Sequence, residues 1–406
     1  MPSFINTLLA ASAVLPAALA KPTIIRTQSA ETISGKYIAR VEDNEFLEAV
    51  LSTVLDVAGV ESTYNYTIGG VKGFTFDGDD GVLDILETLG AIKHVEPDSK
   101  VYATVPYGYL NKKIAPLANT TQQVQNSSTW GLGRISHRES GSNSYSYDDS
   151  AGEGSFIYVI DTGVYTEHNE FEGRASMGAN FIDGEEDSDG QGHGTHCSGT
   201  AAGKTYGVAK KASIIGVKVL GSDGSGTNSG VLRGVEWAVN NAKESGHIDR
   251  TVLSMSLGGT FSQTTNDAIE QAVAEGAFIS VAAGNDGEDA SNSSPASAPG
   301  ACTVGATNEA DSRSDFSNFG KILDIFAPGE EILSSWIGGK TATRTISGTS
   351  MACPHIAGLA AYLIGLEGPR SPAELCSRIQ ELATTDVIQG VGDGSPNLLA
   401  YNGIAA

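Results

Sequence analysis

Basic residues are scarce in this chain. Over 406 residues, 25 Lys and Arg stand against 48 Asp and Glu, so the formal net charge is −23. A field of that sign repels phosphate backbones and anionic lipid headgroups, so we expect neither nucleic-acid binding nor attachment to a membrane surface. A solvated acidic surface accounts for nearly all of this charge, which would also suit cation sites.

Long apolar runs are lacking after the first twenty residues, so we expect no membrane-spanning segment there. Residues 4–20 are apolar and end in Ala-Leu-Ala, the small-x-small pattern that precedes signal-peptide cleavage. An uncleaved anchor is the alternative, but a proline within this stretch and a lysine just after it oppose that reading. We therefore expect residues 1–20 to be a signal peptide and the product to be soluble and secreted, with a vacuolar location as the alternative.

Cysteine is also sparse, with four residues, and an oxidising compartment permits disulfides among them. Spacing alone does not choose among the three possible full pairings. Sequons for N-linked glycosylation fit the secretory route, and the candidates are Asn65, Asn119, Asn126 and Asn292.

The N-terminal region resembles a small α/β unit. Periodicity over residues 21–105 predicts strand, helix, strand, helix, strand, in that order. The expected strands are 35–41, 74–76 and 92–101, and the expected helices are 45–57 and 81–89.

Residues 106–128 are rich in Asn, Thr, Gln, Ser and Pro and read as a linker. After Trp130, strands and helices alternate, which predicts a parallel sheet covered on both faces. The sequence from Ser371 to Glu374 has the form of a capping box with proline at the first helical position. The expected strands are 155–160, 212–220, 252–257 and 278–283, and the helices are 230–242, 267–274, 350–366 and one that begins at Ser371.

Three glycine-associated segments carry reactive side chains. Asp161 directly follows an apolar strand, where catalytic groups gather in open α/β sheets. His193 lies between glycines that leave an imidazole edge open, and Ser350 begins a helix, where free N–H groups favour an anion. Together they supply a carboxylate, an imidazole and a hydroxyl, the set that activates a serine nucleophile.

Taken alone, each of these residues could also have a common structural role. An aspartate after a strand often caps a turn, and a serine often caps a helix. His193, with His196 and Cys197 nearby, invites a zinc reading, but no further ligands at matching spacing are evident. The order Asp, His, Ser differs from that of α/β-hydrolases and chymotrypsin-type enzymes and equals that of subtilisin.

These motifs resemble the signatures of the subtilisin-like serine proteases, and most closely the proteinase K group with its secreted fungal members. Asp161 precedes His193 by 32 residues, and His193 precedes Ser350 by 157. The resemblance runs from about Trp130 to the C-terminus. It implies an α/β fold, with a three-layer parallel-sheet catalytic domain preceded by a small α+β, ferredoxin-like propeptide. The expected domains are 1–20 (signal peptide), 21–122 (inhibitory propeptide with linker) and 123–406 (catalytic domain).

The resemblance implies a broad-specificity secreted endopeptidase that cleaves itself from a zymogen between residues 119 and 126. Ser350 would be the nucleophile, His193 the general base and acid, Asp161 the orienting carboxylate and Asn285 an oxyanion donor. A pocket built from small residues suggests large apolar or aromatic side chains as preferred substrates. The implied substrate-binding residues are Gly224, Ser225, Gly226, Ser256, Leu257, Gly258, Ala282, Ala283 and Gly284.

The resemblance also implies a structural Ca²⁺ held by two carbonyls, of Pro299 and Ala301, and by the carboxylate of Asp324. Oxygen ligands suit that hard cation, and catalysis itself would need no cofactor. A disulfide joining Cys302 and Cys376 is implied. For Cys197 and Cys353 we favour two free thiols, with a bridge between them as the alternative.

Partners are expected to be protein and peptide substrates and the chain's own propeptide, on a monomer. His94 could trigger propeptide release as pH falls, although a surface histidine is the simpler reading. A catalytically dead relative is one rival, opposed by the four intact catalytic positions. An esterase is the other, opposed by the triad order and by Ala352, where a nucleophile elbow has glycine.

Overall fold

The computed structural model describes residues 21–26, 29, 31–104 and 122–404. The expected signal peptide, the sequon at Asn119 and most of the expected linker therefore lie outside the described residues.

The N-terminal unit is an antiparallel sheet with two helices. The sheet order is β3-β4-β2-β5, with β1 parallel to β5. This β-α-β-β-α-β order is ferredoxin-like, as expected. The strand β3 was not predicted, because polar residues fill most of it. The elements are β1 (Thr23–Ile24), β2 (Thr32–Val41), α1 (Leu47–Ala58), β3 (Ser62–Ile68), β4 (Val71–Asp77), α2 (Asp80–Leu86) and β5 (Ile92–Ala103).

Local signals set the bounds of these helices. Gly59 ends α1 in the left-handed conformation, φ 65°, and its N–H donates to the Leu55 carbonyl. The side chain of Asp79 caps α2 by accepting the Val82 N–H. One apolar cluster, which includes Val50, Phe74 and Leu83, closes this unit.

The larger unit contains a sheet of nine strands among the described residues, in the order β20-β21-β17-β16-β14-β12-β8-β10-β9. Its neighbours pair in parallel except for β20. The strands are β8 (Phe156–Asp161), β9 (Ala175–Asn180), β10 (Ser213–Lys218), β12 (Thr251–Met255), β14 (Phe278–Ala282), β16 (Cys302–Thr307), β17 (Ile325–Pro328), β20 (Thr384–Thr385) and β21 (Leu398–Leu399).

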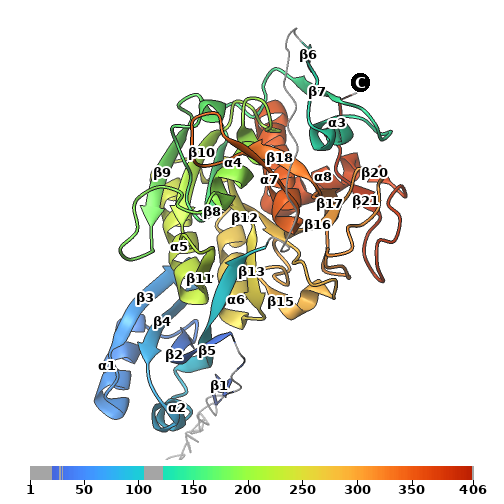
Figure 1. Ribbon diagram of the computed structural model, residues 1–406. Coiled ribbons are helices and arrows are strands. Elements are labelled where there is room, and N and C mark those ends of the chain that lie inside the picture. Colours follow the sequence, from blue (N-terminus) through green and yellow to red (C-terminus); the bar gives the residue numbers. More distant parts are fainter. Residues whose placement is uncertain (1–20, 27–28, 30, 105–121, 405–406) are drawn as a thin grey trace, which may run out of the picture.

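Helices cover both faces of this sheet and produce the expected three layers (Figure 1). One face carries α3 (Trp130–Ser136), α4 (His193–Ala202), α7 (Thr349–Glu367) and α8 (Pro372–Leu382), and the other carries α5 (Asn228–Glu244) and α6 (Gln263–Ala274). The capping box at Ser371 is confirmed. The described residues also contain three 3₁₀ turns, η1 (Asn169–Phe171), η2 (Ile248–Arg250) and η3 (Ala290–Asn292).

Two expectations from the sequence need correction. The linker reading is wrong at its C-terminal end, because β6 (Gln122–Asn126) pairs with β7 (Ser144–Asp148). The expectation of no later apolar span is also wrong by length and composition, since α7 passes that test. However, 89% of its apolar window is buried inside the fold, as in the core helix of a globular domain.

The N-terminal unit, blue in Figure 1, packs against α5 and α6. Its last strand leaves the unit and lies between two short edge strands of the larger unit, β11 (Ser225–Thr227) and β13 (Leu257–Thr260). Beside β13 lies β15 (Ser293–Ser294), and β18 (Ile332–Ser335) forms a hairpin with β19 (Thr343–Ile346). The strand β5 therefore joins the two units through backbone pairing.

Candidate active site

Three elements bring the reactive side chains together. Asp161 is the last residue of β8, His193 is the first of α4, and Ser350 lies in the first turn of α7. All three side chains are buried. Since α4 and α7 pack on the same face of the sheet, the carboxyl end of β8 and the two helix starts meet at one edge.

Asp161 and His193 form a short, buried pair. The imidazole Nδ1 lies 2.7 Å and 2.9 Å from the two carboxylate oxygens. Burial is the largest single effect and would lower the pKa of His193. The charge and hydrogen bond of Asp161, together with those of Cys197, outweigh it and raise that pKa well above its ordinary value. The pair therefore fixes the tautomer of the neutral imidazole and stabilises its protonated form.

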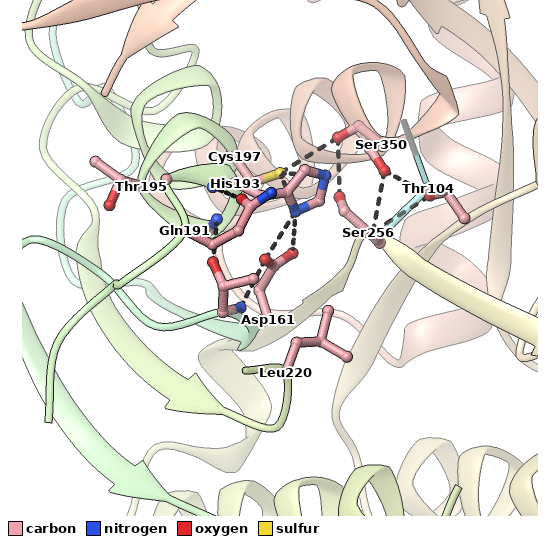
Figure 2. Close-up of polar contacts among 12 residues, drawn as sticks. Thr104, Asp161, Gln191, His193, Thr195, Cys197, Leu220, Ser256 and Ser350 are labelled. Atoms are coloured by element: carbon pink, nitrogen blue, oxygen red, sulfur yellow. Dashed lines mark hydrogen bonds and ion pairs between the residues drawn. The ribbon is translucent and has the colours of Figure 1, made fainter. Parts of the chain in front are cut away.

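The hydroxyl of Ser350 is engaged by a different partner. Its Oγ lies 2.5 Å from the Thr104 Oγ1 and donates to the Ser256 carbonyl at 3.0 Å (Figure 2). Among the hydrogen bonds of the described residues, none joins Ser350 to His193. The structure thus places the three expected residues together, with the serine hydroxyl held by the end of the N-terminal unit.

Asn285 is positioned as a donor that lacks an acceptor. Its Oδ1 accepts the backbone N–H of Thr349 at 2.9 Å and the Thr349 hydroxyl at 3.0 Å. These bonds direct the amide nitrogen away from Thr349, and that nitrogen is buried without a partner among the described residues. Ser350 and Thr349 both lie in the first turn of α7, where backbone N–H groups have no acceptor within the helix. Two donors can therefore serve one oxyanion there.

The implied substrate-binding segments 224–226 and 256–258 already hold a strand between them. Residues 100–102 of β5 pair with β11 on one side, and residues 101–103 pair with β13 on the other, both antiparallel. The Ala103 N–H donates to the Gly224 carbonyl at 3.1 Å, and the Thr104 N–H donates to the Ser256 carbonyl at 3.2 Å. An extended peptide thus fits this groove by backbone hydrogen bonds on both sides.

A cavity of about 420 Å³ opens beside the end of this strand. Small residues predominate among those lining it, and Asn285 lies at its wall. Ala282 and Gly284, the two small residues from which a pocket is expected, both line the cavity, as does Gly258. Ala283, another implied substrate-binding residue, is absent from the lining and packs in a separate apolar cluster.

The zinc reading finds no support in the hydrogen bonds. Ligand atoms of Asp161, His193 and Cys197 lie within 4.8 Å of one another. Yet Nδ1 of His193 is already bonded to the carboxylate, and Nε2 of His196 lies 3.0 Å from the Ile332 carbonyl. Hydrogen bonds therefore explain why the side chains of Asp161, His193 and Cys197 lie close together.

The expected calcium residues lie around β16 and β17. The carboxylate of Asp324 accepts the Thr303 N–H at 2.8 Å and the Gln380 side-chain N–H at 3.2 Å. Among the described residues, no Lys or Arg pairs with it, and burial raises the pKa of Asp324 to about 6. A partly buried carboxylate without a cationic partner fits a site for a metal cation.

The cysteines follow the expected pattern. Cys302 and Cys376 form a disulfide with 6.0 Å between their Cα atoms. Cys197 and Cys353 are free and buried. The Cys197 Sγ lies 3.9 Å from Nδ1 of the catalytic imidazole, within hydrogen-bonding distance for sulfur, and burial raises the pKa of both thiols.

Sequence reasoning missed the residues that fasten the two units together. Glu96 of β5 accepts hydrogen bonds from the Ser262 hydroxyl and from the N–H groups of Gln263 and Thr264 at the start of α6. Asp98 likewise accepts the N–H and hydroxyl of Ser229 at the start of α5. In the sequence these two acids read as ordinary strand residues, because their helix partners are more than 130 positions away.

His94 lies in the same contact and is not a surface residue. Its side chain is buried, and Nε2 lies 2.9 Å from the Thr264 hydroxyl. Burial lowers its pKa to about 4. The simpler reading from the sequence, a surface histidine, is therefore wrong.

Comparison with known proteins agrees with this geometry. The model of the subtilase family matches residues 152–397. The chain is 51% identical to subtilisin-like protease 2 of Pseudogymnoascus destructans over 84% of this chain and 80% of the relative. It is 45% identical to a cuticle-degrading protease of Metarhizium anisopliae over 99% of both chains.

A third fungal relative is alkaline protease 1 of Aspergillus flavus, 44% identical over the whole of both chains. A crystal structure of a cold-adapted subtilisin-like serine proteinase is also similar. It has a TM-score of 0.64 and 42% identity, and the match covers 69% of this chain and 100% of that one. The chain belongs to the subtilase family and is a subtilisin-like serine protease.

Proposed function

We propose that the protein is a secreted endopeptidase of broad specificity, made as a zymogen that processes itself. The observation that carries this proposal is the position of β5. It lies in the groove as an added strand between β11 and β13, and the residue after it touches Ser350. A peptide in that position is bound as an internal segment of a protein substrate would be.

The chemistry follows from the arrangement of four residues. Ser350 Oγ attacks the carbonyl carbon while His193 takes its proton, and Asp161 stabilises the imidazolium that forms. The negative oxygen of the tetrahedral intermediate accepts from the Asn285 amide and the Ser350 N–H. His193 then protonates the leaving amine, and water hydrolyses the acyl-enzyme by the same steps in reverse.

The N-terminal unit acts as an inhibitor in this proposal. Thr104 occupies the position just before a cleaved bond, and its hydroxyl engages Ser350 in place of His193. Glu96 and Asp98 accept hydrogen bonds at the N-termini of α6 and α5. These contacts hold the N-terminal unit in addition to the strand pairing in the groove. A first cut directly after Thr104 would leave the strand bound as a product.

A cut between residues 119 and 126 stays a prediction and would be a second step. Residues 122–126 form β6, which is paired with β7 in the larger unit. A boundary before β6 keeps that pairing intact. The proposed domains are 21–122 and 123–406, and this limit falls one residue inside β6, after Gln122.

Backbone pairing does not read side chains, and this supports broad specificity. The cavity beside Thr104 is larger than a threonine side chain, and its small lining residues favour large apolar or aromatic groups there. A peptide-library profile of the purified enzyme tests this. A preference for Phe, Tyr or Leu before the cleaved bond is expected, and a strict preference for Lys or Arg would contradict it.

A structural Ca²⁺ is proposed at Asp324 with the carbonyls of Pro299 and Ala301. Oxygen donors and a partly buried carboxylate without a cationic partner among the described residues support it. Secretion and glycosylation are proposed together, because the sequons at Asn65, Asn126 and Asn292 are on exposed residues. We propose a monomer that needs no cofactor for catalysis.

A further inference from the structure

Asp189, a buried carboxylate outside the catalytic residues, lies at the N-terminus of α4. The Oδ1 of Asp189 accepts from the Thr162 hydroxyl at 2.8 Å and from the N–H groups of Gln191 at 2.9 Å and Gly192 at 2.7 Å. Its Oδ2 accepts from the N–H and the hydroxyl of Thr195, at 2.9 Å and 2.6 Å. Five hydrogen bonds thus converge on one side chain beside the helix that begins with His193.

Thr162 connects this carboxylate to the catalytic pair. Its hydroxyl donates to Asp189 and accepts the Gly194 N–H at 2.9 Å. Its own N–H donates to Asp161 Oδ1 at 2.7 Å, the same oxygen that binds His193 Nδ1. The residue after the catalytic aspartate is therefore bonded to the residue after the catalytic histidine.

The two backbones approach too closely to tolerate extra atoms. A Cβ on Gly194 would lie 2.1 Å from the Gly163 carbonyl oxygen, so only glycine fits there. The Thr162 carbonyl is fixed from the other side, because it accepts from the buried Lys218 ammonium at 2.7 Å. Small changes in this contact therefore move the imidazole relative to its carboxylate.

We propose that Asp189 and Thr162 are positioning residues, which hold His193 in register with Asp161. Neither hydroxyl nor carboxylate contacts Ser350 or β5 among the described hydrogen bonds, so they act through the pair. The inference rests on the proposed role of that pair in catalysis.

The chemistry of Asp189 explains why a carboxylate is needed. All five of its partners are donors, and among the described residues it has no Lys or Arg ion pair. An asparagine would turn an NH₂ group toward N–H donors on one side and lose those bonds. Its negative charge also lies at the N-terminus of α4, where the helix dipole favours an anion.

The test compares three variants of Thr162 and Asp189 with a matched control. Thr162→Val should lower kcat about tenfold and Asp189→Asn on the order of 10²-fold, because small misplacements at a reacting centre cost that much. KM should change less than about twofold, since substrate contacts are intact. Thr162→Ser keeps the hydroxyl and should restore kcat.

The control is Thr200→Val in the same helix. Thr200 is buried and donates one hydrogen bond to the His196 carbonyl, within α4. It should lower the melting temperature as Thr162→Val does but leave kcat unchanged. Equal kcat for the two valine variants, or no rescue by serine, would overturn the proposal while wild type stays active. An inactive wild-type enzyme would instead count against the proposed function.

A second measurement covers variants that fail to mature. In the full chain carrying Ser350→Ala, the proton shared by His193 and Asp161 should give a low-field NMR resonance. Thr162→Val should shift or broaden it, and Thr200→Val should not. An unchanged resonance in both variants would also overturn the proposal.

Discussion

The hydroxyl of Thr104 lies 2.5 Å from the hydroxyl of Ser350, and its N–H donates to the Ser256 carbonyl. Thr104, at the end of the described N-terminal unit, thus contacts the nucleophile and makes a backbone hydrogen bond of the kind expected for a bound substrate. This contact makes the zymogen proposal testable at one residue.

Thr104→Pro should block the first cut. Proline has no N–H, so the bond to Ser256 is lost and the peptide no longer lies correctly for attack. Thr104→Val, which keeps the N–H and the shape, should still be processed. N-terminal sequencing of the secreted products distinguishes the two, and normal processing at this bond in the proline variant would argue against the placement.

Asn285→Ala should lower kcat by about 10²–10³-fold with little change in KM, because only the transition state uses the amide. This magnitude comes from a subtilisin, a member of the same family. Asn285→Asp is a matched companion, since it keeps the acceptor for Thr349 but supplies no donor. If either variant keeps wild-type kcat, Asn285 is not an oxyanion donor.

Propeptide binding should weaken as pH falls from 6.5 toward 4. The pKa of His94 is lowered by burial from 6.5 to about 4, so the neutral form is favoured in the complex. Its contribution is full above pH 6.5 and is lost as pH falls through that window, by up to about tenfold in affinity per unit. Burial raises the pKa of Glu96 and Asp98, so these carboxylates act in the opposite sense.

The variant His94→Gln isolates the histidine from the two carboxylates. Activity should appear in freshly processed enzyme faster at pH 5 than at pH 7.5, and His94→Gln should remove that acceleration. The same pH dependence in both proteins would show that His94 does not control release.

Calcium should raise the melting temperature of the wild-type enzyme, and a chelator should lower it, if Asp324 holds the ion. Asp324→Asn removes the charge while keeping an acceptor for Thr303. Calorimetry of both proteins in calcium and in chelator measures the difference. Identical calcium-dependent shifts in the two would place the ion elsewhere.

The sequence predicted most of the site because each catalytic residue stands in its own glycine-rich segment. It also predicted the alternating layers, since apolar strands such as Phe278–Ala282 are unambiguous. It failed at β3 and β6, where polar residues fill most of each strand, although Tyr64, Tyr66 and Ile68 of β3 alternate as in a half-buried strand. Nor could it find Thr104, Asp189 or Glu96, whose roles depend on partners brought close only by folding.

The most direct test compares wild type with Ser350→Ala by intact mass, N-terminal sequencing and casein hydrolysis. The account predicts that wild type is cut first after Thr104 and then between residues 119 and 126, and that it digests casein. The variant should remain an unprocessed precursor with activity lower by about 10⁴–10⁶-fold. Self-processing or casein turnover by the variant at the wild-type rate would contradict Ser350 as the nucleophile.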